Sequence, residues 1–263
     1  MRSFSLLVVF TCFSTVMMHA QKKSVMSFAA NKVVAHRGAF KKNGFPENSI
    51  ASLKEAIRLG CTGSEFDVRM TADDSLVINH DPHHNGLEIE KTDFATLRHF
   101  PLANGEPIPT LRSYLLAGME HNKKTRLVLE IKPSGVSKER AKVIVNKIWQ
   151  LVNELKAAPR IVYISFDYDM LKEMRRLDPA ANLQFLDGTI APAQLKADAM
   201  NGADYHFSVF KKNPQWIKEA KENNIALNAW TVNDSETMQW LIKEGFDFIT
   251  TNEPEQLLQL TGK

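Results

Sequence analysis

The stretch SEFDVRMTADDSLVINH, residues 64–80, decides the fold. It contains two β-rich runs, Ser64–Val68 and Leu76–His80, which are separated by only seven residues. A crossover between parallel strands takes about a dozen residues or more, and the segment between these runs, Thr71–Ser75, has the composition of a turn. Residues 64–80 are therefore predicted to form a hairpin in which the second run returns antiparallel to the first.

Outside this hairpin, short β-rich runs alternate with helical patterns. One apolar stripe of helical spacing covers residues 50–57 and ends at Gly60, and another covers residues 143–151. Alternation of this kind predicts parallel strands joined by helices. The predicted parallel strands are Lys32–His36, Ser64–Val68, Arg126–Ile131, Ile161–Ser165, Asn182–Leu186, Asp204–Ser208, Ala226–Trp230 and Phe246–Thr250.

Eight such strands in roughly 240 residues match the size and strand count of a (β/α)8 TIM-type barrel. An open doubly wound sheet is the rival fold, but no glycine-rich dinucleotide fingerprint follows the first predicted strand. The α/β fold predicted here is thus a single barrel with a short insertion after the second-strand hairpin.

The first twenty residues differ in composition from the rest. Arg2 precedes a mostly apolar, uncharged run, Phe4–Met18, which is shorter than the about 20 apolar residues of a membrane span. Residues 1–20 are predicted to be a secretory signal peptide cleaved after Ala20, with an uncleaved N-terminal anchor as the alternative. The remainder, residues 21–263, is then one exported domain, periplasmic or secreted, with no integral membrane span.

Composition excludes some functions. The formal net charge of +3 is not concentrated in any basic run, which argues against a nucleic-acid partner. Cys12 and Cys61 are the only cysteines, so removal of the signal leaves one, which cannot form an internal disulfide and is expected to be a packing residue. Zinc-ligand spacing of cysteine and histidine is absent. The oligomeric state is left open.

Carboxylates gather where the predicted strands end. Glu65 and Asp67 lie two residues apart and therefore on one face of their strand, and Glu130 and Lys132 repeat this spacing on the next parallel strand. Barrel enzymes carry their active sites at this carboxyl-terminal rim. Three carboxylates without cysteine suit a hard cation, Mg²⁺ or Ca²⁺, better than zinc.

Two histidines are predicted at the same rim. His36 ends the first strand, and a hairpin turn centred on residues 73 and 74 would place His80 opposite Asp67. Histidines can divide general-base and general-acid work, and Arg37 offers a planar fork for a phosphate oxygen. These residues favour a metal-assisted phosphate-cleaving enzyme. A metal-dependent barrel enzyme that abstracts a proton from a carboxylate substrate is the competing interpretation.

The order of short motifs resembles the glycerophosphodiester phosphodiesterase family across about residues 32–260. The motifs that carry the resemblance are His36-Arg37-Gly38, Pro46-Glu47-Asn48-Ser49, Glu65-Phe66-Asp67-Val68, Thr71, His80-Asp81, Pro109-Thr110-Leu111, Glu130-Ile131-Lys132, Ser165-Phe166 and Trp230-Thr231-Val232-Asn233.

The resemblance implies a role for each matching residue: acid/base catalysis for His36 and His80, metal binding for Glu65, Asp67 and Glu130, and phosphate or substrate contact for Arg37 and Lys132. It also implies a two-step reaction, in which a glycerol hydroxyl attacks phosphorus and water then opens a cyclic phosphate. The products are glycerol 3-phosphate and an alcohol.

Other residues near the predicted rim carry weaker expectations. Trp230 is expected to form a wall for the glycerol moiety, and Phe166 and Phe40 could line the same mouth. Glu47 has two interpretations: it contacts the metal or substrate, or it lies near the positive end of the helix over residues 50–59, with Asn48 as the N-cap. The pair of residues 83 and 84, both histidine, is expected in an exposed loop.

The segment from Pro82 to Pro107 departs from the family pattern because it lacks the usual Arg-Thr-Thr step. Since this segment is expected to shape the pocket beyond the phosphate, the identity of the alcohol that is released stays undetermined. Two alternatives therefore stay open. One is an enzyme of the same site acting on a lysophospholipid, as a lysophospholipase D, or on an inositol phosphodiester. The other is a catalytically silent barrel that binds phosphodiesters, although such a binder has no need of both His36 and His80.

Overall fold

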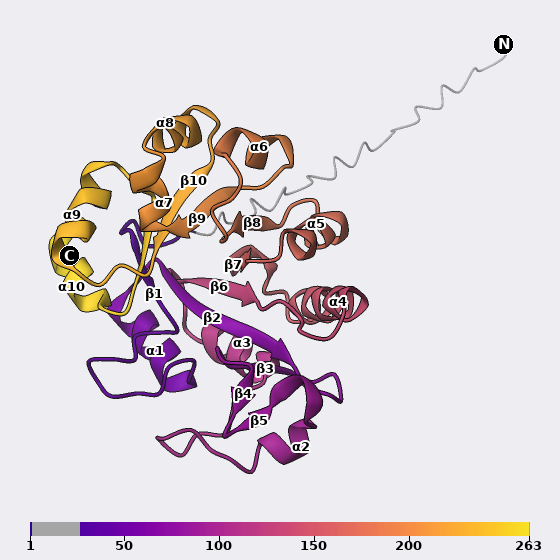
Figure 1. Ribbon diagram of the computed structural model, residues 1–263. Coiled ribbons are helices and arrows are strands. Elements are labelled where there is room, and N and C mark those ends of the chain that lie inside the picture. The colour runs from indigo at the N-terminus through magenta and orange to yellow at the C-terminus, as the bar shows by residue number, and fades with distance from the viewer. Residues whose placement is uncertain (2–26, 263) are drawn as a thin grey trace.

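A computed structural model describes residue 1 and residues 27–262, and in this part of the chain eight parallel strands close into a barrel (Figure 1). The barrel strands are β1 (Val33–Ala35), β2 (Gly63–Met70), β6 (Arg126–Ile131), β7 (Ile161–Ser165), β8 (Asn182–Phe185), β9 (Gly202–His206), β10 (Ala226–Trp230) and β11 (Phe248–Thr251). Because β1 pairs with both β11 and β2, the ring is closed. The predicted fold is confirmed.

Helices surround the strands on the outside of the ring (Figure 1). They are α1 (Ile50–Leu59), α2 (Phe94–Leu97), α3 (Leu111–Met119), α4 (Lys138–Glu154), α5 (Tyr168–Leu177), α6 (Pro192–Ala197), α7 (Phe207–Lys212), α8 (Gln215–Glu222), α9 (Ser235–Lys243) and α10 (Pro254–Leu260), with 3-10 turns η1 (Ile89–Lys91) and η2 (Ala158–Arg160). Within residues 27–262, none of these helices has both the length and the apolar character needed to cross a bilayer. The predicted signal peptide, residues 1–20, lies outside the described residues except for residue 1.

Helix α1 follows the sequence prediction at its C-terminal end and departs from it at its N-terminal end. Gly60 ends the helix with a φ of 73°, a conformation that glycine adopts without steric cost. At the other end the N-cap is Ser49, whose hydroxyl accepts from the backbone N–H of Ser52 at 3.0 Å. The prediction that Asn48 caps this helix is wrong by one residue.

The hairpin forms as predicted, but its register differs. Strand β3 (Leu76–Ile78) pairs antiparallel with β2, and Val68 lies opposite Ile78. The residue beside Asp67 is therefore Asn79, whose backbone N–H donates to the Asp67 carbonyl at 3.0 Å. The predicted pairing of His80 with Asp67 is wrong by one residue because the turn is centred on Asp73 and not between Asp73 and Asp74.

One predicted strand begins and ends too late, and another begins and ends too early. Strand β9 covers Gly202–His206, whereas the prediction was Asp204–Ser208, because residues 207–212 already form α7. Strand β11 starts at Phe248, and Phe246 instead packs among the surrounding helices. The first of these shifts moves the side chain of Asp204 from the start of the strand to its middle.

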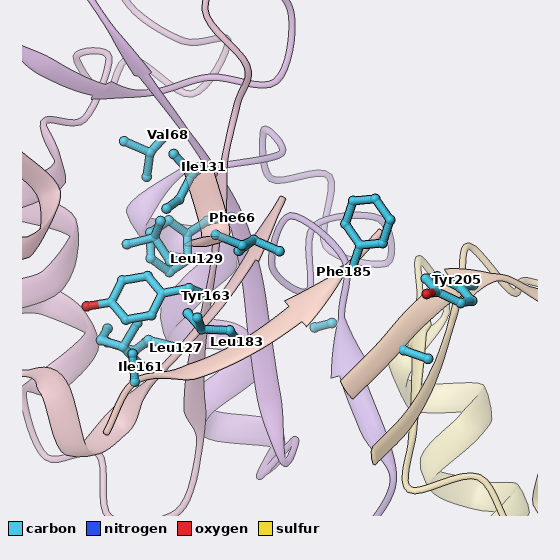
Figure 2. Packing of buried hydrophobic residues seen from close by; sticks show 14 of the residues in the cluster. Phe66, Val68, Leu127, Leu129, Ile131, Ile161, Tyr163, Leu183, Phe185 and Tyr205 are labelled. Carbon is cyan, nitrogen blue, oxygen red and sulfur yellow. The ribbon is translucent and has the colours of Figure 1, made fainter. Parts of the chain in front are cut away.

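Alternate residues of the strands pack into two separate layers. The larger layer lies between strands and helices and includes Phe66, Leu129, Tyr163 and Phe185 (Figure 2). The smaller one fills the barrel interior with Val34, Val128, Val162, Ile164 and Leu186. This interior layer forms the floor beneath the carboxyl-terminal rim. Cys61 is fully buried in the larger layer, where burial raises the pKa of its thiol to about 12, as expected for a packing residue.

The insertion after β3 contains a two-stranded ribbon, β4 (His83–His84) with β5 (Leu87–Glu88), followed by η1 and α2. It has a small apolar core of its own that includes Val77 of β3: Val77, Ile89, Leu97 and Ile108. Its last turn returns to the barrel through Glu106, whose carboxylate accepts from the backbone N–H groups of Ile50 and Ala51 at 2.9 and 3.2 Å. The insertion is thereby fixed to the N-terminus of α1.

Candidate active site

The turn after β1 places a histidine and an arginine at the carboxyl-terminal rim. Arg37 has a φ of 54° and Gly38 a φ of 81°, and a Cβ on Gly38 would approach the Ser52 side chain to 2.4 Å. Only glycine fits this close approach to α1. The turn directs the backbone N–H of Arg37 to Glu65 Oε2, at 2.7 Å.

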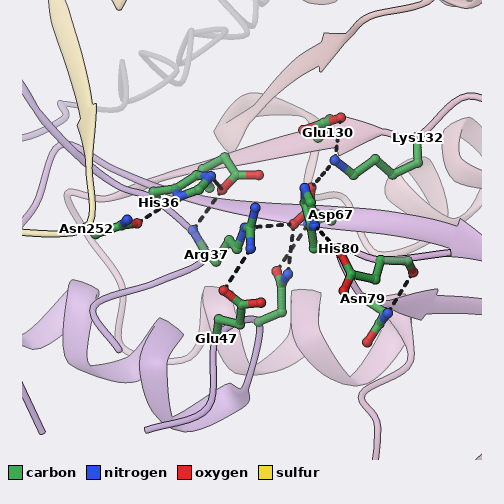
Figure 3. A network of polar contacts seen from close by, with 12 residues as sticks. His36, Arg37, Glu47, Asp67, Asn79, His80, Glu130, Lys132 and Asn252 are labelled. Carbon is green, nitrogen blue, oxygen red and sulfur yellow. Dashed lines mark hydrogen bonds and ion pairs between the residues drawn. The ribbon is translucent and has the colours of Figure 1, made fainter. Parts of the chain in front are cut away.

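The three predicted metal-binding carboxylates converge at the same rim. Glu65 and Asp67 of β2 and Glu130 of β6 are all buried, and each offers an oxygen within 4.8 Å of the oxygens of the other two. The ladder between the strands explains this, because Asp67 lies directly opposite Glu130 in the parallel register. Figure 3 shows Asp67 and Glu130 on either side of the Lys132 ammonium group.

Lys132 is the main cation of this cluster. Its Nζ lies 2.9 Å from Asp67 Oδ1 and 2.8 Å from Glu130 Oε1. Burial opposes ionisation of Asp67, but the close contact with the charged Lys132 and the hydrogen bond from Asn48 outweigh it and lower the pKa of this carboxyl. One ammonium group therefore balances part of the charge of the three carboxylates.

Burial and the negative charge that Lys132 does not balance raise the pKa values of the other two carboxyls, those of Glu65 and Glu130. Burial, followed by the charges of Asp67 and Glu130, raises the pKa of Glu65 well above its ordinary value. Burial and the charge of Asp67 raise the pKa of Glu130 to about 7. Moreover, Glu65 Oε1 is buried and has no hydrogen-bond partner among the described residues. An oxygen-only set with excess negative charge and an unpartnered oxygen fits a divalent cation.

The two predicted acid/base histidines line the same cavity and differ in exposure. His36 Nδ1 lies 2.7 Å from Asn252 Oδ1, which accepts a hydrogen bond from the Nδ1–H group, so Nε2 of the neutral ring is left unprotonated. Burial, and then the charge of Arg37, lower the pKa of His36 to about 4. His80 is more exposed, with 35% of its side chain accessible, and its Nδ1 lies 2.7 Å from Asp81 Oδ1.

Arg37 connects the cluster to Glu47. Its Nε lies 3.8 Å from Asp67 Oδ2, and its terminal nitrogen donates to Glu47 Oε2 at 2.8 Å (Figure 3). Glu47 is exposed, its carboxylate is not among the three that converge, and the carboxylate at the N-terminus of α1 is that of Glu106. Of the two interpretations of Glu47, the one in which its charge interacts with the N-terminus of α1 does not hold, because Glu106 occupies that position and Glu47 contacts Arg37.

A cavity of about 130 Å³ opens in front of these groups. Seven of the residues predicted for the site line it: His36, Arg37, Glu65, His80, Glu130, Lys132 and Trp230. Phe166, 39% exposed, lines it too and packs edge-on against Trp230 with ring centroids 5.5 Å apart. Asp67 is not part of this lining. It is 1% exposed and contacts the lining residue Lys132.

The structure also places residues in the cavity wall that sequence reasoning missed. Asp204 lines the cavity from β9, and His206, two residues later on the same face, packs against Trp230 at 5.3 Å between ring centroids. Neither residue was predicted, because the predicted strand began at Asp204 and the observed one begins at Gly202. Their i, i+2 spacing, which repeats that of Glu65 and Asp67, was the available signal. His83 is exposed as predicted, whereas His84 is half-buried and contacts the Phe100 carbonyl.

Comparison with known proteins gives a family for this site. The model of the glycerophosphoryl diester phosphodiesterase family matches residues 36–256. A relative named glycerophosphodiester phosphodiesterase from Caldanaerobacter subterraneus subsp. tengcongensis is 32% identical over 248 residues, which span 88% of this chain and 98% of the relative.

Solved structures agree with the sequence comparison. The crystal structure of a glycerophosphodiester phosphodiesterase from Parabacteroides distasonis superposes with a TM-score of 0.85 at 39% identity, covering 89% of this chain and 98% of the other. A phosphodiesterase from Oleispira antarctica, solved in complex with the product sn-glycerol-3-phosphate, has a TM-score of 0.75 at 23% identity and covers 88% of this chain and 96% of its own. At that identity the second likeness concerns the fold alone.

Proposed function

Because the chain belongs to the glycerophosphoryl diester phosphodiesterase family, we propose that it hydrolyses glycerophosphodiesters to glycerol 3-phosphate and an alcohol with the help of a divalent cation. One observation carries the proposal: two histidines, two cationic side chains and two carboxylates of the acidic cluster line a single cavity at the rim of the barrel. Metal-assisted cleavage of a phosphodiester needs these three kinds of group together.

The cations of the site are suited to the phosphate group. Arg37 presents its guanidinium to the cavity, where Glu47 fixes one end, and Lys132 presents its ammonium group from β6. Both can donate to phosphate oxygens whose negative charge increases as the attacking group approaches phosphorus. We assign phosphate binding to these two residues.

The two histidines differ in the way that an acid and a base should differ. His36 is neutral at working pH, since its pKa is lowered to about 4, and its Nε2 has a free lone pair. It suits the acceptance of the proton from the attacking glycerol hydroxyl. His80 lies at the exposed side, with Asp81 orienting its ring, and suits protonation of the departing alcohol. In the second step, which opens the cyclic phosphate with water, the two roles reverse.

Glu65, Asp67 and Glu130 would hold the cation, and their oxygen-only chemistry favours Mg²⁺ or Ca²⁺. When bound, the cation supplies positive charge that neutralises the phosphate and lowers the pKa of a coordinated hydroxyl. The protein's own contribution is to hold the three carboxylates in place, through the Arg37 backbone N–H at Glu65 and the amide of Asn48 at Asp67.

We further propose that the protein is exported, on the basis of the apolar run that follows Arg2 and the polar residues that follow Ala20. The domain that acts is then residues 21–263. Fractionation and mass spectrometry test this: envelope protein with an N-terminus at Gln21 supports export with cleavage, envelope protein with an N-terminus at Met1 supports the uncleaved anchor, and protein confined to the cytoplasm contradicts export.

The activity is tested by glycerol 3-phosphate release from glycerophosphocholine, -ethanolamine, -inositol and -glycerol, with EDTA and with Mg²⁺ or Ca²⁺ added back. Metal-dependent release from any of the four establishes the reaction, and the two add-backs identify the cation. Absence of release from all four, by folded metal-loaded protein, overturns the proposal. Lysophospholipids would then be the next substrates, and a silent phosphodiester-binding barrel the remaining interpretation.

A further inference from the structure

The wall of the cavity opposite the acidic cluster is largely apolar, and Asp204 is the only residue of a charged type among the described lining residues on that side. Its neighbours along this wall include Ile164, Leu186 and Trp230, and the other polar members are Thr231 and Thr250. Asp204 points inward from the middle of β9 and is only 1% exposed. Ligand pockets commonly have this composition, with few polar groups placed in an apolar lining.

Polar contacts connect the residues around Asp204. The hydroxyl of Thr250 donates to Asn228 Oδ1 at 3.2 Å, which leaves the Asn228 amide nitrogen as a donor. Asn228 lies directly opposite Asp204 in the parallel register of β9 and β10, and the interaction with its side chain opposes the rise in the pKa of the Asp204 carboxyl. The indole Nε1 of Trp230 donates to the Asp204 backbone carbonyl at 2.8 Å.

One oxygen of the Asp204 carboxyl group has no hydrogen-bond partner among the described residues. This atom, Oδ1, is buried. A buried polar atom without a partner is destabilising, so native proteins seldom retain one unless a ligand or an ordered water satisfies it. The oxygen belongs to a side chain that lines the cavity.

We propose that Asp204 binds a hydroxyl of the glycerol moiety and thereby makes the site specific for glycerol-bearing phosphodiesters. The inference rests on the proposed function and assigns a substrate contact beyond it. Burial, and then the charge of Glu130, raise the pKa of the Asp204 carboxyl well above its ordinary value. The group can therefore accept a hydrogen bond in either protonation state and also donate one while it is protonated.

The depth of Asp204 argues for the glycerol moiety and against the leaving alcohol. Glycerol is the part that all substrates of this class share, and an enclosed, rigid wall suits a constant group. The alcohol varies in size, and the exposed side of the cavity, near His80 and Phe166, can accommodate that variation. Ile164 and Leu186 beside Asp204 would contact the carbon atoms of glycerol.

The test compares two ligands that differ only by glycerol. Binding of sn-glycerol 3-phosphate and of inorganic phosphate to the metal-loaded protein is measured by calorimetry for the wild type, Asp204→Ala and Asp204→Asn. We expect Asp204→Ala to weaken glycerol 3-phosphate about tenfold, as for one lost hydrogen bond to a buried partner, and to leave phosphate unchanged. Asp204→Asn, which keeps the shape and a hydrogen-bonding oxygen, should stay within about threefold of the wild type.

Turnover gives a second readout. For Asp204→Ala, kcat/KM should fall by a similar factor with glycerophosphocholine, -ethanolamine and -glycerol. The matched control is Asp187→Ala, which removes an exposed carboxylate just beyond β8 at the same rim and should change neither readout. Thermal unfolding of each variant shows whether it is folded; if the alanine variant is not, Asp204→Ser, which is smaller and still polar, replaces it.

Three results would overturn the inference: an equal loss of affinity for glycerol 3-phosphate and phosphate, a kcat/KM loss confined to cationic head groups, or no change in either measurement. The first result would mean that Asp204 acts electrostatically or structurally and does not contact glycerol. The second would mean that it contacts the leaving alcohol, and the third that it is a buried polar residue without a role in binding. Failure of the wild type to release glycerol 3-phosphate would reject the proposed function instead, while the two binding measurements remain interpretable.

Discussion

Asn48 and Asp67 are joined by two hydrogen bonds: the Asn48 amide donates to Asp67 Oδ2 at 2.8 Å, and the backbone N–H of Asp67 donates to Asn48 Oδ1 at 3.2 Å. Asn48 is 4% exposed and has a φ of 59°. The loop after β1 thus fixes both the backbone and the carboxylate of one proposed metal ligand. Outer residues that orient metal ligands in this way influence metal affinity strongly.

Replacing Asn48 tests this orienting role. Asn48→Gly removes both hydrogen bonds while relieving the positive φ, so the side chain alone is tested. We expect metal affinity or kcat/KM to fall about 10- to 100-fold, measured by metal titration and by glycerol 3-phosphate release. The matched control is Asn146→Ala, which removes a half-buried amide of α4 that donates to the Lys142 carbonyl within the same helix. Unaltered metal affinity and unaltered turnover in Asn48→Gly would exclude an orienting role.

The excess charge of the acidic cluster makes a prediction about stability. In metal-free protein, Glu65→Gln should raise the melting temperature, because it removes a buried carboxyl whose pKa is raised by burial and by its acidic neighbours. Added Mg²⁺ or Ca²⁺ should stabilise the wild type by about 2.7 kcal/mol at a hundred times the dissociation constant, and the variant far less. Calorimetry with and without EDTA measures both effects.

Glu47→Gln is the control for that experiment, since Glu47 is exposed and contacts Arg37, outside the cluster. It should keep the full metal-dependent rise in melting temperature. A wild-type protein whose melting temperature does not respond to either cation would contradict the assignment of Glu65, Asp67 and Glu130 as metal ligands.

His80 is predicted to act in turnover and to leave metal binding unaffected. Loss of a general acid or base typically lowers the rate about 10²- to 10⁴-fold. His80→Ala should therefore reduce kcat by this range in assays with saturating cation, while a metal titration remains as in the wild type. His83→Ala removes a neighbouring exposed histidine and should leave both measurements unchanged. Retained turnover in His80→Ala would remove His80 from the mechanism.

Glu106 is predicted to contribute to stability through helix α1. Its carboxylate accepts from two backbone N–H groups at the start of that helix, those of Ile50 and Ala51. Glu106→Ala should reduce the free energy of unfolding by about 1 kcal/mol, as for loss of a helix cap. Urea denaturation measures the difference. Glu120→Ala, which breaks an exposed ion pair with Lys54, should change it by less than about 0.5 kcal/mol; equal effects would argue against capping.

Local sequence predicted well what depends on local pattern. Runs such as Arg126–Ile131 and Ala226–Trp230 are rich in strand-forming residues, and their bounds are those of β6 and β10. Strand β9 was misplaced because Phe207-Ser208-Val209 has the composition of a strand, yet the chain turns there into α7. Tertiary context decides between two such possibilities, and no periodicity of a short apolar segment reveals it.

Site residues on strands could be predicted from the strand periodicity, whereas the contacts of site residues in loops could not. The i, i+2 spacing of Glu65 and Asp67 was sufficient to bring both carboxylates to one face. The partners of Asn48 and Glu47 depend on the course of the loop after β1, which takes positive φ values at Arg37, Gly38 and Asn48. Such conformations are selected by contacts with α1 and β2, which lie elsewhere in the chain.

The attachment of the hairpin has a consequence for the evolution of this barrel. Hydrogen bonding around the ring closes through the pairs β1–β2 and β2–β6, whereas β3 pairs with residues 68–70 at the carboxyl end of β2 and makes an isolated bridge to Thr110. The carboxylates thus belong to the ring, and His80 belongs to an appendage that the ring does not require for closure. Selection can remodel or lose the appendage while the cation site survives. A descendant that binds phosphodiesters without cleaving them is therefore within reach of changes in this appendage alone.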